Sequence, residues 1–279
     1  MIQIQDFSFT YKNGETPALQ EIRLEVPDGG FLGIIGPAGA GKTTLARAVA
    51  GIIPHHYTGD FYGSVTVNGL DTVDSSIADL SRLVGTVFQD VESQIISPLV
   101  EDELLYGLEN FGIPREEIPG RIGEALAKVG IAELRERSIS SLSGGQRQKV
   151  AIASIIALKP QILVLDEPTG ELDPRSSRQI FSLLKELNEE QGVTIILIEQ
   201  KIMLLCEFAR QLAVLSEGRI IRHGDTREVL SHADELQALG VNCPRVTTLG
   251  KILSEKTGTE QPVCVNLDEA ENMVRRLIP

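Results

Sequence analysis

Hydrophobic residues in this chain gather into short runs that alternate with longer segments of helical spacing. Runs that are apolar almost throughout are typical of strands buried on both faces of a sheet. Three such strands are expected, at 31–35, 162–165 and 194–198. Helices are expected at 43–50, 144–158 and 176–190. This alternation predicts the α/β class, with a mainly parallel core sheet that helices cover.

The remaining segments divide the chain into regions. Apolar residues alternate with polar ones over 2–9 and 22–26, which predicts an N-terminal antiparallel β region. Residues of about 90–145 are expected to form a helical subdomain, with breaks at Gly112, Pro114 and Pro119. From 225 onward the pattern changes to short helices and loops. We therefore expect one large domain over 1–224 and a small C-terminal segment over 225–279.

Composition narrows the possible partners. The 279 residues can bury a large core, and a hydrophobic content of 42% is typical of a folded chain. No apolar run approaches the ~20 residues that a membrane-spanning helix needs. The three cysteines form no CxxC pair, which argues against a zinc site or a disulfide framework. Because the net charge is −13, we expect no nucleic-acid partner, and any membrane contact should be made through proteins.

A glycine-rich loop follows the first buried strand. Residues 36–44 read GPAGAGKTT and match the phosphate-loop pattern G-x-x-x-x-G-K-[ST]. The expected ATP-binding residues here are Gly36, Pro37, Ala38, Gly39, Ala40, Gly41, Lys42, Thr43 and Thr44. Lys42 should reach the β- and γ-phosphates, while the Thr43 hydroxyl should hold Mg²⁺. The alternative is a glycine-rich turn that matches by chance, but the preceding strand and following helix favour the phosphate loop.

Two carboxylates end the second buried strand. Asp166 and Glu167 follow 162–165, at the edge of a parallel sheet where ligands bind. Asp166 would hold Mg²⁺, and Glu167 would orient or deprotonate an attacking water. Alone, the pair could equally be a turn or a strand-end cap. Beside a phosphate loop, it becomes the second half of one nucleotide site.

The segment 142–146 reads LSGGQ and opens a predicted helix. Its free N–H groups could bind an anion, although Ser143 could also be an ordinary capping residue. At this point residues 1–224 resemble the ABC ATPase family, whose signature is LSGGQ, and the resemblance implies the P-loop NTPase fold. In that family the signature binds the ATP held by a second subunit. The resemblance therefore implies a dimer, identical or paralogous, in which Ser143, Gly144, Gly145 and Gln146 contact the partner's nucleotide.

Further positions match the family residue by residue. Tyr11 stands where the family stacks an aromatic ring on adenine, with a tyrosine of the core or surface as the alternative. Gln89 matches the glutamine that contacts Mg²⁺ and couples to a transmembrane protein. The 172–173 segment matches the loop that crosses the dimer interface. Gln200 replaces the usual histidine at the γ-phosphate, and because an amide cannot become cationic, we expect slowed hydrolysis.

The segment after Gln89 indicates a subgroup. It reads DVESQI, then SP and VEDE, and is similar to ATPases of energy-coupling factor importers, whose usual NPxxQ is altered here at Asp90-Val91. The run 51–55 and the Gly/Pro layout after residue 239 also resemble that subgroup, in which the tail dimerises. The resemblance implies ATP and Mg²⁺ as ligands, a transmembrane coupling protein as partner, and a place at the cytoplasmic face of the membrane, powering vitamin or metal-ion uptake.

Three alternatives remain open from the sequence. The chain could serve another kind of ABC transporter, or it could be a regulatory subunit that binds ATP without cleaving it. It could also be a soluble ABC-type clamp acting on ribosomes or DNA. Clamp proteins carry two motif sets or a long coiled coil, and this acidic chain has neither.

Overall fold

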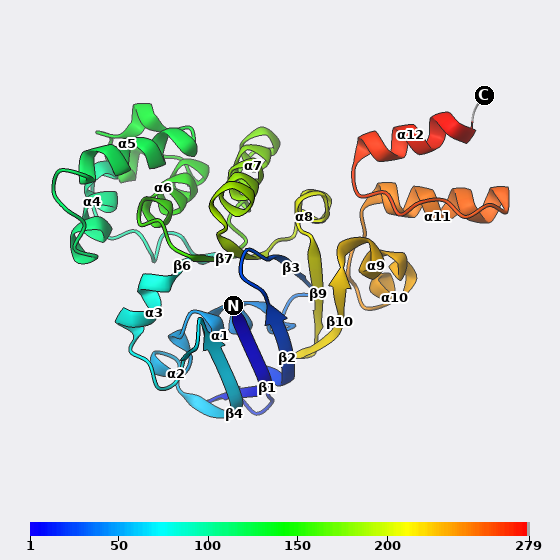
Figure 1. Ribbon diagram of the computed structural model, residues 1–279, viewed down its shortest axis with the longest axis horizontal. Coiled ribbons are helices and arrows are strands. Elements are labelled where there is room, and N and C mark those ends of the chain that lie inside the picture. Colours follow the sequence, from blue (N-terminus) through cyan, green and yellow to red (C-terminus); the bar gives the residue numbers. More distant parts are fainter. Residues whose placement is uncertain (278–279) are drawn as a thin grey trace.

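Two β-sheets form the framework of residues 1–277, which the computed structural model describes (Figure 1). The larger sheet has six strands in the order β10-β9-β3-β8-β7-β6. They are β3 (Phe31–Ile35), β6 (Val84–Val87), β7 (Ile162–Asp166), β8 (Thr194–Ile198), β9 (Gln211–Ser216) and β10 (Arg219–Asp225). Neighbouring strands pair in parallel except β9 with β10, which confirms the expected mainly parallel sheet.

Opposite faces of this sheet carry two hydrophobic cores. Along β3, Leu32 and Ile34 belong to one core, whereas Phe31 and Ile35 belong to the other, as the two-residue period of a strand requires. The first core is closed by α1 (Lys42–Val49) and the second sheet. The other core is closed by α7 (Pro174–Gln191) and by the helical region. Burial on both faces explains why these strands read as continuous apolar runs.

The second sheet is antiparallel and confirms the expected N-terminal β region. Its order is β2-β1-β4-β5. The strands are β1 (Ile2–Tyr11), β2 (Leu19–Val26), β4 (Gly59–Val67) and β5 (Leu70–Asp71). Since β1 lies between β2 and β4 along nearly its whole length, the sheet extends to Tyr11, two residues beyond the alternating pattern.

The helical region comprises α4 (Val100–Asn110), α5 (Ile118–Lys128) and α6 (Gly144–Ala157). Two 3₁₀ turns, Ala132–Leu134 and Ile139–Ser141, lie between α5 and α6. The expected break at Pro119 is wrong, because Pro119 stands in the first turn of α5. A proline there costs nothing, since the first N–H groups of a helix have no intrahelical acceptor.

Three short helices had no clear signal in the sequence pattern. They are α2 (Ile52–His55), α3 (Ile77–Leu83) and α8 (Ile202–Phe208). Helices of four to seven residues are too short for a 3.6-residue period to become visible. Of these three, only α3 has a helix-start signal in the sequence. Ser76 caps it, because its side chain accepts a hydrogen bond from the Asp79 N–H.

Four helices follow the large sheet. They are α9 (Thr226–Ser231), α10 (Ala233–Ala238), α11 (Arg245–Thr257) and α12 (Leu267–Leu277). In Figure 1, α11 and α12 extend on the side of the molecule opposite to α4 and α5. The division into 1–224 and 225–279 stays a prediction, and its last two residues lie outside the described part. Within residues 1–277, no helix combines the length and apolar character that crossing a membrane requires.

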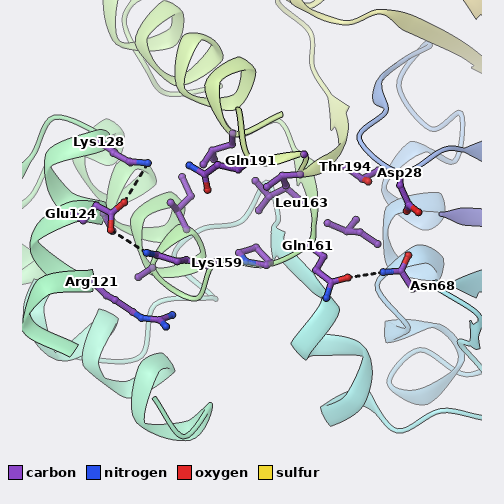
Figure 2. Close-up of a pocket in the computed structure, with 18 residues that line it drawn as sticks. Asp28, Asn68, Arg121, Glu124, Lys128, Lys159, Gln161, Leu163, Gln191 and Thr194 are labelled. Atoms are coloured by element: carbon purple, nitrogen blue, oxygen red, sulfur yellow. Dashed lines mark hydrogen bonds and ion pairs between the residues drawn. The ribbon is translucent and has the colours of Figure 1, made fainter. Parts of the chain in front are cut away.

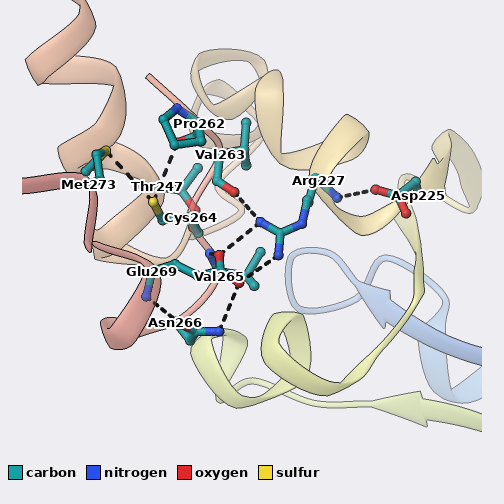
Figure 3. Close-up of polar contacts among 10 residues, drawn as sticks. All are labelled: Asp225, Arg227, Thr247, Pro262, Val263, Cys264, Val265, Asn266, Glu269 and Met273. Atoms are coloured by element: carbon teal, nitrogen blue, oxygen red, sulfur yellow. Dashed lines mark hydrogen bonds and ion pairs between the residues drawn. The ribbon is translucent and has the colours of Figure 1, made fainter. Parts of the chain in front are cut away.

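Arg227 of α9 holds the loop between α11 and α12, together with the start of α12 (Figure 3). Its guanidinium donates to the Val263 carbonyl at 2.6 Å and to both carboxylate oxygens of Glu269, at 2.7 and 2.9 Å. The same carboxylate accepts from the Val265 N–H at 3.1 Å. The Arg227 hydrogen bond is the main reason why the pKa of Glu269 lies below its usual value. One ion pair thus joins α9, the 262–266 loop and the start of α12.

We expect Arg227→Ala to loosen α11 and α12 while leaving the two sheets intact. The pair is half exposed, so its loss should cost roughly 1 kcal/mol, or about fivefold in the local opening equilibrium. Arg227→Lys should recover only part of this, because an ammonium cannot bind a carboxylate through two parallel N–H bonds.

Native-state hydrogen exchange, resolved by segment, measures this effect. Arg275→Ala is the matched control, because Arg275 pairs with Glu271 inside α12 at an exposed site. The Glu269 contribution should be present at neutral pH and disappear as the pH falls through its lowered pKa. Equal exchange in the Arg227 and Arg275 variants would contradict the attachment.

Candidate functional site

A cavity of about 510 Å³ lies at the carboxyl ends of β3, β7 and β8. Half of its lining residues belong to the end of β3, the loop that follows it and the first turn of α1. The others come from the residue before β2, from the segments that follow β6, β7 and β8, and from a distant C-terminal loop. The lining residues outside 35–44 are Ala18, Gln89, Glu167, Glu199, Gln200, Ile202, Gly240, Val241 and Asn242. The structure therefore brings three separately predicted segments to one place.

The glycine-rich loop is held in a shape that larger residues could not adopt. At Gly36 an added Cβ would stand 2.1 Å from the Leu215 carbonyl oxygen. At Gly41, which has a φ of 101°, it would stand 2.5 Å from the Ala18 oxygen. All the predicted loop residues line the cavity except Ala40, which is buried behind it. The loop leaves a backbone cradle of the kind that binds phosphate oxygens.

Lys42 supplies the positive charge of this cradle. Its Nζ donates to the carbonyl oxygens of Gly36 and Pro37, at 2.9 and 2.8 Å. Burial lowers the pKa of Lys42, while the nearby carboxylates of Glu167 and Asp166 act in the opposite direction. The ammonium is thus held over the loop by weak carbonyl acceptors, which an anionic ligand can replace.

Thr43 and Asp166 form the pair that best suits a magnesium ion. The Thr43 hydroxyl donates to Asp166 Oδ2 at 2.5 Å, and Asp166 is 2% exposed. Burial raises the pKa of Asp166, and the Thr43 hydrogen bond partly offsets that rise. A divalent cation would favour the ionised carboxylate, and hydroxyl and carboxylate oxygens are ligands that Mg²⁺ accepts. The residues present therefore fit the ion that the sequence implies.

The Glu167 carboxylate stands between two side-chain amides. Gln89 Nε2 donates to Oε2 at 3.2 Å, and Gln200 Nε2 donates to Oε1 at 2.6 Å. Glu167 has a φ of 53°, an uncommon value for a residue with a side chain. Its carbonyl accepts from Gln148 of α6 at 3.0 Å, which helps hold this backbone. The carboxylate is fixed from both sides and faces the cavity.

A buried polar cluster lies beneath Gln200 and was not anticipated from the sequence. The Glu199 carboxylate accepts from the Thr169 hydroxyl at 2.5 Å and from the Gln200 N–H at 3.0 Å. Lys201 Nζ donates to the Thr169 and Leu172 carbonyls and to the Ser177 hydroxyl, at 2.6 to 2.8 Å. The cluster ties the segment after β8 to the loop before α7. The sequence indicates this cluster only by placing two charged residues, Glu199 and Lys201, on either side of Gln200 at the end of a strand.

Tyr11 does not line the cavity. Its hydroxyl lies 3.1 Å from the Thr44 hydroxyl, and its ring packs edge-on against Phe9, with centroids 4.8 Å apart. Arg47 also donates to the hydroxyl at 3.3 Å, and its guanidinium lies over the Tyr57 ring. Tyr11 therefore supports the first turn of α1 from behind, and its stacking on adenine stays a prediction.

The LSGGQ segment lies away from this cavity, at the start of α6. Ser143 Oγ accepts from the Gln146 N–H at 3.3 Å, while Gln146 Oε1 accepts from the Ser143 N–H at 2.9 Å. This reciprocal pair is a capping box. An added Cβ at Gly145 would stand 3.0 Å from the Glu171 backbone oxygen, so the loop before α7 packs closely on the signature. No residue of 143–146 lines its own chain's cavity.

The C-terminal loop 240–242 was also missed as part of the site. Gly240, Val241 and Asn242 line the same cavity as the phosphate loop. Val241 is buried in the large core, and its N–H donates to the Leu236 carbonyl of α10 at 2.8 Å, which holds the loop in place. The sequence offered only a glycine between two short helices, which is a common turn signal.

Comparison with known proteins agrees with this geometry. A family model described as ABC transporter matches residues 19–170. A protein of Pyrococcus horikoshii, assigned by inference as an ABC transporter ATP-binding protein, is 40% identical over 99% of this chain and 96% of its own length. An energy-coupling factor transporter ATP-binding protein, EcfA1 of Caldanaerobacter subterraneus, is 40% identical over 94% of both chains.

Solved structures give the same result. CbiO1 of Clostridium perfringens, part of the ABC transporter complex CbiONQ, has a TM-score of 0.73 and 31% identity over 90% of this chain and 98% of its own. A dimeric ATP-binding cassette with bound ADP and phosphate has a TM-score of 0.72 and 29% identity, over 81% and 99%. These likenesses extend over nearly the whole length, and they show that the chain belongs to the ABC transporter family of ATP-hydrolysing proteins.

Proposed function

We propose that this chain is the ATPase subunit of an importer of the energy-coupling factor class, taking up a vitamin or a metal ion. The observation that carries the ATPase function is the placement of Lys42, Thr43 and Glu167 at one cavity, with the buried Asp166 hydrogen-bonded to Thr43 directly behind it. The subgroup is supported by the EcfA1 and CbiO1 relatives and by the sequence after Gln89.

The catalytic roles follow from the contacts. The backbone cradle and Lys42 would hold the phosphates of ATP, and Glu167 would orient and deprotonate the attacking water. Thr43, Asp166 and Gln89 would hold Mg²⁺, which would supply charge neutralisation. Gln89 and Gln200 donate to Glu167 and so set the direction of its free lone pairs. Ser143, Gly144, Gly145 and Gln146 would act on the nucleotide of the second subunit.

The expected assembly is a dimer with an identical or paralogous ATPase subunit, docked on a transmembrane coupling protein at the cytoplasmic face of the membrane. A dimeric structural relative supports the first partner. Loop 169–173 packs on the signature helix, so a partner that presses on either element would move both. Service to another class of ABC transporter is the second candidate.

Purification of the tagged chain from its native membrane tests the function. We expect a coupling protein and a substrate-binding membrane subunit to copurify and the complex to hydrolyse ATP. Glu167→Gln should lower turnover about 10²- to 10⁴-fold while ATP still binds, because only the general base is lost. A complex that lacks the separate substrate-binding subunit would indicate another transporter class. Undiminished turnover in the variant would remove Glu167 from the mechanism.

Gln200→His should raise turnover in the assembled complex. Gln200 Nε2 lies 2.6 Å from Glu167, so an imidazole at this place could carry positive charge beside the base and the γ-phosphate. Steady-state ATP hydrolysis between pH 6 and 8, at saturating ATP, measures the effect. Gln200→Ala is the matched control that removes the amide without adding a proton carrier. If the histidine variant matches the natural protein, Gln200 does not slow the reaction.

Lys201→Met should lower turnover more than it lowers ATP affinity. It would leave three closely placed acceptors without a charged donor, which costs about 1.5–3 kcal/mol per bond to a charged group. The loop 169–173 and Gln200 would then lose their fixed relative position. Lys201→Arg should recover part of the rate. A fall in kcat with little change in KM would distinguish this displacement of the loop and Gln200 from a loss of folding. Lys185→Met, on the exposed face of α7, is the control.

A further inference from the structure

A second cavity, of about 380 Å³, lies at the opposite edge of the six-stranded sheet from the phosphate loop. It opens where β7 and β8 begin, between α5 on one side and the last turn of α7 on the other (Figure 2). None of the residues assigned to ATP binding or hydrolysis lines it. The cavity is therefore not explained by the nucleotide chemistry.

The floor of this cavity is apolar. Ala125 of α5, Ala157 of α6, Leu163 of β7 and Leu187 of α7 are each at most 5% exposed. The volume lies at the lower end of the roughly 300–1,000 Å³ that is typical of small-molecule sites. Such a floor suits a compact apolar body of one or two rings.

The α5–α6 wall carries more positive than negative charge. Arg121, Lys128 and Lys159 line the cavity around one carboxylate, Glu124 (Figure 2). Glu124 lies 3.4 Å from Lys128 Nζ and 3.3 Å from Lys159 Nζ. In a chain with a net charge of −13, a cavity lined by three cations and two carboxylates, Glu124 and Asp28, carries a small local excess of positive charge.

These cations are available to a ligand. Arg121 and Lys128 have further partners, Glu117 and Glu186, but neither of these carboxylates lines the cavity. Partly exposed pairs of this kind contribute little to stability, so a bound anion can share or replace them. On the facing wall, Asp28 is already paired with the N-terminal amine.

The cavity lies between parts of the fold that contact each other at its two ends. Lys128 at the end of α5 pairs with Glu186 of α7 at 3.4 Å. On the sheet side, Asn68 donates to Gln161 at 2.8 Å, which closes the opposite end. A body lodged between these contacts would touch α5, α6, β7 and α7 together and oppose their relative movement.

We infer that this cavity binds a small amphipathic organic anion, with a ring system on the apolar floor and a carboxylate or phosphate among Arg121, Lys128 and Lys159, and that the bound molecule braces α5 against α7. The site lies outside the ATPase mechanism and does not depend on which solute the transporter carries.

Titration calorimetry with 2-naphthoate tests the inference, with saturating Mg²⁺ and ADP present so that the nucleotide cavity is filled. The expected result is one saturable site. Arg121→Gln and Lys159→Gln should each weaken binding about threefold to fivefold, as the loss of one exposed charge pair implies. Ala157→Leu should abolish binding by filling the floor. Lys185→Gln, an exposed lysine of α7 outside the cavity, should leave the affinity unchanged.

Two further comparisons test whether the ligand must be an anion and whether it holds α5 against α7. The neutral 2-naphthamide has the same rings and should bind more weakly than the carboxylate. Bound naphthoate should slow hydrogen exchange in α5 and the last turn of α7. Absence of saturable binding, or equal affinity in the Arg121, Lys159 and Lys185 variants, would overturn the site. Equal affinity of the amide would overturn the anion, and unchanged exchange would overturn the bracing.

Discussion

Parallel pairing of β3, β8 and β7 is the constraint on which the site depends. Ile198 of β8 pairs with Ile34 of β3 on one side and with Asp166 of β7 on the other. The three strands therefore end at the same level, and whatever follows each strand must meet the others. The phosphate loop, the Glu167 carboxylate and the Gln200 amide come together because the backbone register leaves them no other place.

Side-chain hydrogen bonds then hold the loops that this register brings together. Glu199 and Lys201 hydrogen-bond to the loop before α7, through the Thr169 hydroxyl and the Thr169 and Leu172 carbonyls. A buried charge is tolerated only when its polar partners are close and numerous. The same contacts that satisfy the charges also fix where Gln200 and the interface loop lie, so the local electrostatics and the geometry of the site share one cause.

The contiguous parts of the site could be predicted, and the parts built by distant side chains could not. The loop 36–44 and the Asp166-Glu167 pair are local patterns whose strand and helix context is also local. The Gln200 position followed from the family resemblance, which places a histidine at the end of that apolar strand. In contrast, the contacts of Lys201 require knowing that α7 begins beside β8, and the place of loop 240–242 requires the packing of α10. For Tyr11 the family position alone does not determine which way the ring faces, and its stacking on adenine stays a prediction.

The sheet order has a consequence for how the protein is made. The strand that carries the phosphate loop is flanked by late segments, because Phe31 pairs with Ile195 and Leu32 pairs with Gln211. During synthesis β3 therefore stays unpaired on both edges, with its apolar side chains uncovered, until β8 and β9 have left the ribosome. Such long-range pairing is slow to form and exposes strand edges meanwhile. ATP, which binds only the completed arrangement, would draw the newly made chain toward its folded state by mass action.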